Sequence, residues 1–121
     1  MNVQTVKVPH LGGIDVAYRT SGSHDSSKPT LVLVHSFMTS GALYDAQLKS
    51  EKLTGVANLI AIDLLGHGST RSPIENFTYW DSAIMTLQLL DSLKINKFFA
   101  LGTSQGGWIV VRMALLAPNR V

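Results

Sequence analysis

The residues with the clearest chemical potential lie in the turn Gly102-Thr103-Ser104-Gln105-Gly106. An apolar run at 98–101 leads into this Gly-x-Ser-x-Gly pattern and another at 108–117 leaves it, so the sequence predicts a strand, a tight turn and a helix. Such a turn strains the backbone of its central serine and leaves room only for small residues two positions before and after it. Ser104 is therefore the candidate nucleophile, with an ordinary glycine-rich turn between a strand and a helix as the alternative.

Backbone N–H groups beside Ser104 suit the same chemistry. If Gln105, Gly106 and Gly107 open a helix, their N–H groups have no partner within that helix. These donors and the positive end of the helix dipole would then point toward the group that the serine attacks. The segment thus predicts a nucleophile together with hydrogen-bond donors for its target.

Hydrophobic periodicity and turn residues predict the elements that position this segment. Apolar runs and alternation indicate strands at 3–8, 14–19, 30–34, 58–62 and 97–101. Helical spacing and end signals indicate helices at 42–53, 78–93 and 106–117. The first two strands are predicted to form an antiparallel hairpin with a turn at 11–13.

Buried strands that alternate with helices indicate an α/β fold, a mostly parallel sheet with helices on both faces. The strand at 30–34 is an aliphatic run without polar alternation, as is typical of a central parallel strand. Ligands of such sheets bind beyond the carboxyl ends of the strands. The loops that begin at His35, Asp63 and Gly102 lie there, so we expect them to converge on one crevice.

Composition limits the kinds of partner. The 121 residues carry a net charge of +2 with scattered Lys and Arg, which argues against a nucleic-acid surface. The chain has no secretory signal pattern and no apolar run long enough to span a membrane, so we expect an intracellular protein, cytoplasmic by default. The absence of cysteine excludes disulfides, a thiol nucleophile and thiolate metal sites. We expect no cofactor and no metal.

Three motifs together resemble the α/β-hydrolase family. They are His35-Ser36-Phe37, the turn Asp63-Leu64-Leu65-Gly66-His67-Gly68-Ser69-Thr70, and the serine turn, called the nucleophile elbow in that family. The resemblance implies that residues 1–121 are a partial α/β-hydrolase domain: the N-terminal portion of the fold with strands 1 to 5 and the elbow helix, without its C-terminal strands. More narrowly, the chain resembles small hydrolases of fungal secondary-metabolite and host-selective toxin gene clusters.

The resemblance also implies roles. The backbone N–H groups of Gln105 and Phe37 would form the oxyanion hole, while Ser36 stands where the family usually has glycine and would strain that loop if a glycine-only angle is needed. A serine nucleophile favours acyl transfer from a small carboxylic ester, thioester, amide or lactone. The acyl acceptor would be water or an alcohol, so an acyltransferase is an open alternative.

The base and acid that a serine nucleophile needs are the missing part. In the family both follow the elbow, yet no Asp, Glu or His follows Ser104 in this sequence. His35 and His67 lie on loops that could approach Ser104, whereas His10 and His24 read as solvated surface residues. Asp63 is expected to support the turn that carries His67.

Family strand order would place strand 97–101 at an open sheet edge, which favours self-association. We therefore expect a truncated hydrolase that is inactive alone and self-associates through this edge. A non-catalytic remnant, or a binding or assembly partner, is the alternative. A full-length relative from the toxin gene clusters would carry a peroxisomal targeting signal, so a peroxisomal location is the alternative to the cytoplasm.

Overall fold

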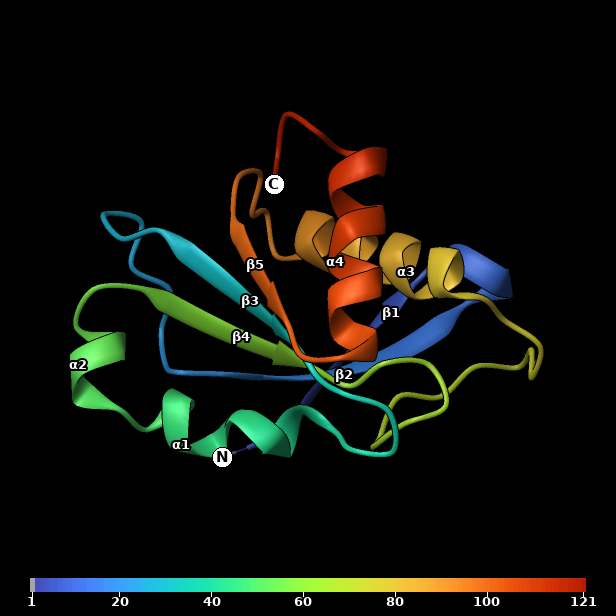
Figure 1. The fold of residues 1–121 in the computed structure, drawn as a ribbon, viewed down its shortest axis with the longest axis horizontal. Coiled ribbons are helices and arrows are strands. Elements are labelled where there is room, and N and C mark those ends of the chain that lie inside the picture. Colours follow the sequence, from blue (N-terminus) through green and yellow to red (C-terminus); the bar gives the residue numbers. More distant parts are fainter. Residues whose placement is uncertain (1) are drawn as a thin grey trace.

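The computed structural model describes residues 2–121, which fold around one five-stranded sheet (Figure 1). The strand order is β1-β2-β4-β3-β5. The strands are β1 (Gln4–Val8), β2 (Ile14–Thr20), β3 (Thr30–Val34), β4 (Asn58–Ile62) and β5 (Phe99–Gly102). The predicted strands and N-terminal hairpin are confirmed, and this strand order is the one expected for the N-terminal portion of the α/β-hydrolase fold.

The sheet is mixed. β1 and β2 form the antiparallel hairpin around a short 3-10 turn, η1 (His10–Gly12), and β2 also pairs antiparallel with β4. β3 pairs parallel with β4 on one side and with β5 on the other. β4, β3 and β5 are therefore adjacent parallel strands, and their carboxyl ends meet at the same edge of the sheet, as the predicted crevice requires.

The single helix predicted at 42–53 is wrong. The segment forms three short pieces, η2 (Gly41–Tyr44), α1 (Asp45–Leu48) and α2 (Glu51–Thr54). Ser50 interrupts them with an extended backbone, φ −72° and ψ 116°, and its hydroxyl accepts a hydrogen bond from the Leu53 N–H. A serine that bonds to the backbone in this way starts a new helix instead of continuing the previous one.

The two long helices follow the prediction closely. α3 spans Tyr79–Ser92, and the Asp81 carboxylate accepts the Thr78 N–H at 2.7 Å, as the predicted capping residues require. α4 spans Gln105–Leu116 and begins directly after Ser104. Both helices pack on one face of the sheet, while η2, α1 and α2 lie along the other (Figure 1).

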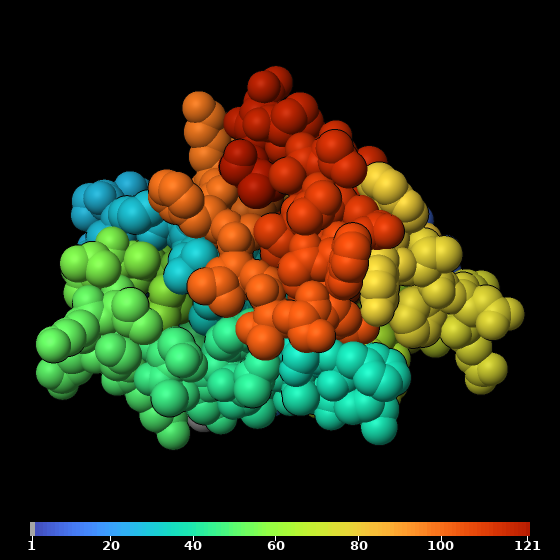
Figure 2. Space-filling model, viewed as in Figure 1, coloured from blue at the N-terminus to red at the C-terminus, as the bar shows by residue number. Residues whose placement is uncertain are grey.

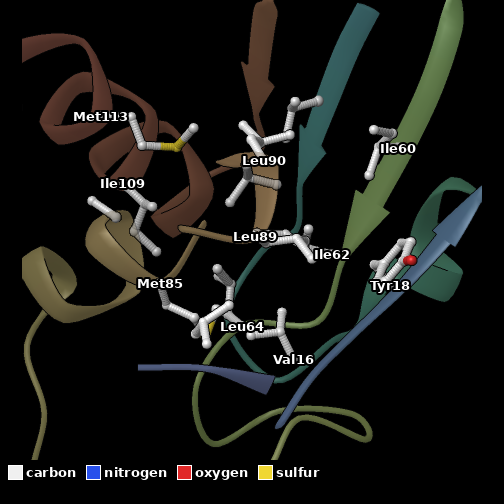
Figure 3. Close-up of a cluster of buried hydrophobic side chains, with 14 of the residues drawn as sticks. Val16, Tyr18, Ile60, Ile62, Leu64, Met85, Leu89, Leu90, Ile109 and Met113 are labelled. Carbon is white, nitrogen blue, oxygen red and sulfur yellow. The ribbon is translucent and has the colours of Figure 1, made fainter. Parts of the chain in front are cut away.

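The main core fills the space between the sheet and the α3–α4 pair. Figure 3 shows Met85 and Leu89 of α3 and Ile109 and Met113 of α4 in the space between these helices and the strands, in one cluster with Ile62 of β4. All of these side chains are at most 1% exposed. A smaller cluster on the opposite face joins β3 and β4 to the short helical pieces through Leu33, Tyr44, Leu48, Leu59 and Ala61.

Candidate active site

The elbow has the strained backbone that its sequence predicts. Ser104 lies between the end of β5 and the start of α4, with φ 54° and ψ −114°, and is exposed. A positive φ is unfavourable for any residue with a side chain, and such strain persists only where the surroundings impose it. The turn therefore presents the Ser104 side chain at the carboxyl edge of the sheet.

Close backbone packing imposes this conformation. A Cβ atom added to Gly102 would lie 2.2 Å from the Gly106 carbonyl carbon, and one added to Gly106 would lie 2.0 Å from the Val34 carbonyl oxygen. The Thr103 N–H donates to that same oxygen at 3.0 Å, which ties the turn to the end of β3. The need for small residues on both sides of Ser104 is thus a direct consequence of contact between backbones.

Tyr44, which sequence reasoning missed, supports the elbow from the other face of the sheet. Its hydroxyl donates to the Val34 carbonyl at 2.9 Å and lies 2.6 Å from the Thr103 Oγ1 atom. Burial raises the pKa of Tyr44. The only sequence signal was a tyrosine in a weakly amphipathic segment, which does not reveal a partner 59 residues away.

Two unpaired N–H groups flank the same cavity beside the elbow. Within residues 2–121, neither the Gln105 N–H nor the Phe37 N–H donates to another protein group. Both residues line a cavity of about 250 Å³. Figure 2 shows the loop after β3 against the start of α4 on the face in view.

The position of Ser36 does not need a glycine-only backbone angle. Ser36 is not among the residues with positive φ, whereas Met38 has φ 65°. The Ser36 carbonyl accepts two hydrogen bonds from Thr39, one from the backbone N–H at 3.3 Å and one from the side-chain hydroxyl at 2.8 Å. The loop therefore closes as a tight turn. A serine therefore fits where the family usually has glycine.

The cavity is mostly apolar. Its lining residues are Phe37, Met38, Leu64, Leu65, Gly66, His67, Phe77, Tyr79, Ser82, Gln105 and Ile109. They come from the loops after β3 and β4 and from the first turns of α3 and α4. This confirms that distant loops converge at one edge of the sheet, and the polar groups that they bring there are few.

Neither nearby histidine bonds to Ser104 in the part of the chain that the structure describes. The His35 Nε2 atom accepts the Leu64 N–H at 2.9 Å, and the His67 Nε2 atom accepts the Met38 N–H at 3.1 Å. Each ring nitrogen that could take a proton from a serine is thus already an acceptor for a backbone N–H. Desolvation lowers the pKa of His35, which is fully buried.

Asp63 supports the turn that carries His67, as predicted. Its buried carboxylate accepts the Gly41 N–H at 2.7 Å and the Ser69 N–H at 2.9 Å, and pairs with Arg19 at 3.1 Å. These bonds join the turn to η2 and β2. With all its partners in the surrounding backbone and Arg19, Asp63 holds loops in place and has no contact with the elbow.

The expectation for His10 was wrong. Its ring is half-buried, and the Nε2 atom lies 2.8 Å from the Asp81 carboxylate at the start of α3. Its backbone N–H donates to the Gln88 side chain at 2.9 Å. Periodicity does not indicate this contact because it joins residues 71 positions apart. His24 is exposed, as expected.

Neither a metal site nor a membrane-spanning helix is found in residues 2–121. No group of three or more His, Asp or Glu side chains is placed to hold a metal ion. Over the same residues, no helix is long and apolar enough to cross a bilayer.

The fold, with a strained serine between β5 and α4, defines a hydrolase-like α/β protein, and comparison with known families agrees. The family described as alpha/beta hydrolase fold matches residues 29–121. The chain therefore belongs to the α/β-hydrolase family.

Three relatives show the extent of the likeness. An uncharacterised hydrolase of Saccharomyces cerevisiae is 34% identical over 95% of this chain and 39% of its own length. A solved hydrolase of Pseudomonas aeruginosa shares 32% identity with a TM-score of 0.85, over 98% of this chain and 43% of its own. The N-acyl homoserine lactonase AidH shares 25% identity with a TM-score of 0.83, over 98% and 42%. The chain thus spans about two fifths of each relative.

Proposed function

We propose that Ser104 is the nucleophile of a serine α/β-hydrolase site that acts on a small carboxylic ester, thioester or lactone. The observation that carries this proposal is the backbone of Ser104, with its positive φ held by the contacts of Gly102 and Gly106. Maintaining strain at a serine with an exposed side chain fits a reactive group better than an ordinary turn. The hydroxyl would attack the acyl carbon and form an ester intermediate.

In this proposal the N–H groups of Gln105 and Phe37 stabilise the oxyanion that forms. Both N–H groups are without a partner in residues 2–121, and the two residues line one cavity. The start of α4 adds the positive end of its dipole next to Ser104. One donor of this kind contributes about 3 kcal/mol to transition-state stabilisation.

The cavity favours an apolar acyl or alcohol group on the substrate. Most of its walls are hydrophobic side chains, and the aromatic rings of Phe37, Phe77 and Tyr79 line it together with the His67 ring. AidH, which shares the fold of this chain, was solved with N-hexanoyl homoserine lactone, an acyl lactone. The apolar walls and this relative support a small lactone or ester as the proposed substrate. A role in secondary metabolism belongs to the same proposal through the resemblance to toxin-cluster hydrolases.

A non-catalytic binding role is the second candidate. It is favoured by the two histidines near the elbow, since the Nε2 atoms of both rings accept backbone N–H groups. With these residues alone Ser104 would have no general base, so we propose that the 121-residue chain does not turn over substrate. A serine without its base still retains the help of the oxyanion hole.

We also propose that the chain self-associates along β5. The strand lies at the sheet edge, and Phe99 and Leu101 are 68% and 47% exposed. Exposed apolar edges of this kind pair with other chains.

The test for the nucleophile is covalent labelling with a fluorophosphonate probe, followed by peptide mass spectrometry. Since these residues supply no general base, we expect slow adduct formation that is confined to Ser104 and absent from the Ser104→Ala variant. Ser36→Ala serves as the matched control because Ser36 is also a serine at this edge, and it should keep the adduct. Labelling spread evenly over several serines, or none on Ser104, would contradict the proposal.

A further inference from the structure

Two loops at the carboxyl edge hold each other through a reciprocal pair of histidines. His35 follows β3, and its Nε2 atom accepts the N–H of Leu64 in the loop after β4 at 2.9 Å. His67 lies in the loop after β4, and its Nε2 atom accepts the N–H of Met38 in the loop after β3 at 3.1 Å. Each loop thus supplies a ring acceptor for a backbone donor of the other loop.

The remaining ring nitrogens fix the tautomer of both rings. The Nδ1 atom of His35 lies 2.8 Å from the Ser36 carbonyl, and that of His67 lies 2.8 Å from the Leu65 carbonyl. Since a carbonyl oxygen only accepts, each Nδ1 must carry the hydrogen and each Nε2 must be bare. The two ring centroids are 5.1 Å apart.

His67 contacts both segments that carry the proposed oxyanion donors. Met38, whose N–H it accepts, directly follows Phe37, and the Phe37 ring packs edge-on against it with centroids 5.7 Å apart. The side-chain amide nitrogen of Gln105 lies 3.5 Å from the same Nε2 atom. Phe37 and Met38 are 64% and 78% exposed, so little else in the described chain covers this loop.

We propose that His67 is a positioning residue for the oxyanion hole. Its bare Nε2 atom fixes the Met38 N–H and with it the preceding peptide, and so holds the Phe37 N–H in the orientation that the proposed oxyanion hole needs. The role rests on the proposed function of Ser104. In this role the ring acts as a hydrogen-bond acceptor and takes no part in proton transfer.

Long-range proton–nitrogen NMR on the unmodified chain gives the first test. The proposal requires the His67 ring to carry its hydrogen on Nδ1 and to be bare at Nε2. A hydrogen on Nε2 would overturn the proposal, because that nitrogen could not then accept the Met38 N–H.

Two variants of His67 distinguish the effect of losing the hydrogen-bond acceptor from the effect of losing the ring. His67→Phe keeps a planar ring without an acceptor, whereas His67→Gln keeps an acceptor oxygen at the end of a side chain of similar reach. In the Phe variant we expect amide exchange at Met38 to become about tenfold faster, in line with loss of one hydrogen bond. The amide signals of Phe37 and Gln105 should also shift. In the Gln variant both readouts should return toward those of the unmodified chain, and His24→Phe is the control that changes neither.

The rate of adduct formation at Ser104 tests whether the orientation of the two oxyanion donors affects the reactivity of the serine. The fluorophosphonate rate should fall about tenfold in His67→Phe and recover in His67→Gln, as expected when one oxyanion donor is misdirected. Unshifted Phe37 and Gln105 amides in His67→Phe would overturn the positioning role even if the variant labels slowly. If Ser104 takes no adduct in the unmodified chain, the proposed nucleophile fails, while the amide signals still decide whether His67 positions the two donors.

Discussion

The two edges of the sheet are built from different side chains. β1, at one edge, exposes Gln4, Thr5 and Lys7, and the Lys7 ammonium pairs with Asp15 of β2 at 3.0 Å. β5, at the other edge, exposes Phe99 and Leu101 and carries no charge. Lysine and other polar groups prevent an edge strand from pairing with further chains. β1 is therefore a protected edge, and β5 is an edge suited to being covered.

Helix α4 extends the uncovered surface of β5. Its outward side chains Trp108, Val111 and Leu115 are 64%, 54% and 67% exposed, although its inner face is fully packed. Ser104 joins these two elements. The elbow thus lies where the fold combines close backbone packing on its inner side with an exposed apolar surface on its outer side.

The largest effect is expected from crowding the elbow at the end of β5. Gly106→Ala should destabilise the chain by about 3 kcal/mol because the added Cβ would meet the Val34 carbonyl at 2.0 Å. Gly107→Ala is the matched control, since its Cβ would meet only the Gly102 oxygen at 3.7 Å and alanine favours a helix. Urea unfolding measures both. Equal stability of the two variants would contradict the close packing.

Charges placed on the open edge should weaken self-association. The double variant Phe99→Lys and Leu101→Lys removes two exposed apolar side chains and gives β5 the protection that Lys7 gives β1. We expect an apparent dissociation constant at least about tenfold higher by sedimentation equilibrium. Thr5→Lys on β1 should leave association unchanged. If Thr5→Lys weakens association as much, the contrast between the two edges fails.

Stability should fall in mildly acidic solution because of His35. Burial lowers the pKa of this ring below its ordinary value of 6.5. Below pH 6.5 the unfolded chain takes up a proton that the folded chain does not, so the free energy of unfolding is full above this pH and declines below it toward the lowered pKa. Urea unfolding at about pH 7.5 and about pH 5.5 measures the decline. It should be smaller in His35→Gln and unchanged in His24→Gln, and equal slopes in all three would contradict the assignment.

The smallest effect is expected at the protected edge. Lys7→Ala removes the ion pair with Asp15. The side chains of Lys7 and Asp15 are 67% and 46% exposed. Water screens such a pair, so the free energy of unfolding should change by less than about 1 kcal/mol. A larger loss in urea unfolding would mean that charge on β1 contributes to folding as well as to keeping the edge unpaired.

Local patterns predicted the strands, the α3 and α4 helices and the elbow because each depends on neighbours in the sequence. The break at Ser50 was missed because a side-chain bond to Leu53 competes with helix continuation. The roles of Tyr44 and of the paired histidines were missed for another reason. Their partners lie 10 to 59 residues away and are brought together only by the parallel arrangement of β3, β4 and β5.

The reaction of this chain with p-nitrophenyl butyrate tests the central claim most directly. The claim is that residues 2–121 hold a reactive serine and its oxyanion donors without a general base. We expect slow release of one equivalent of p-nitrophenol, absent in Ser104→Ala, followed by no turnover above background. Steady turnover that depends on Ser104 would contradict it, because a base would then have to act within these residues.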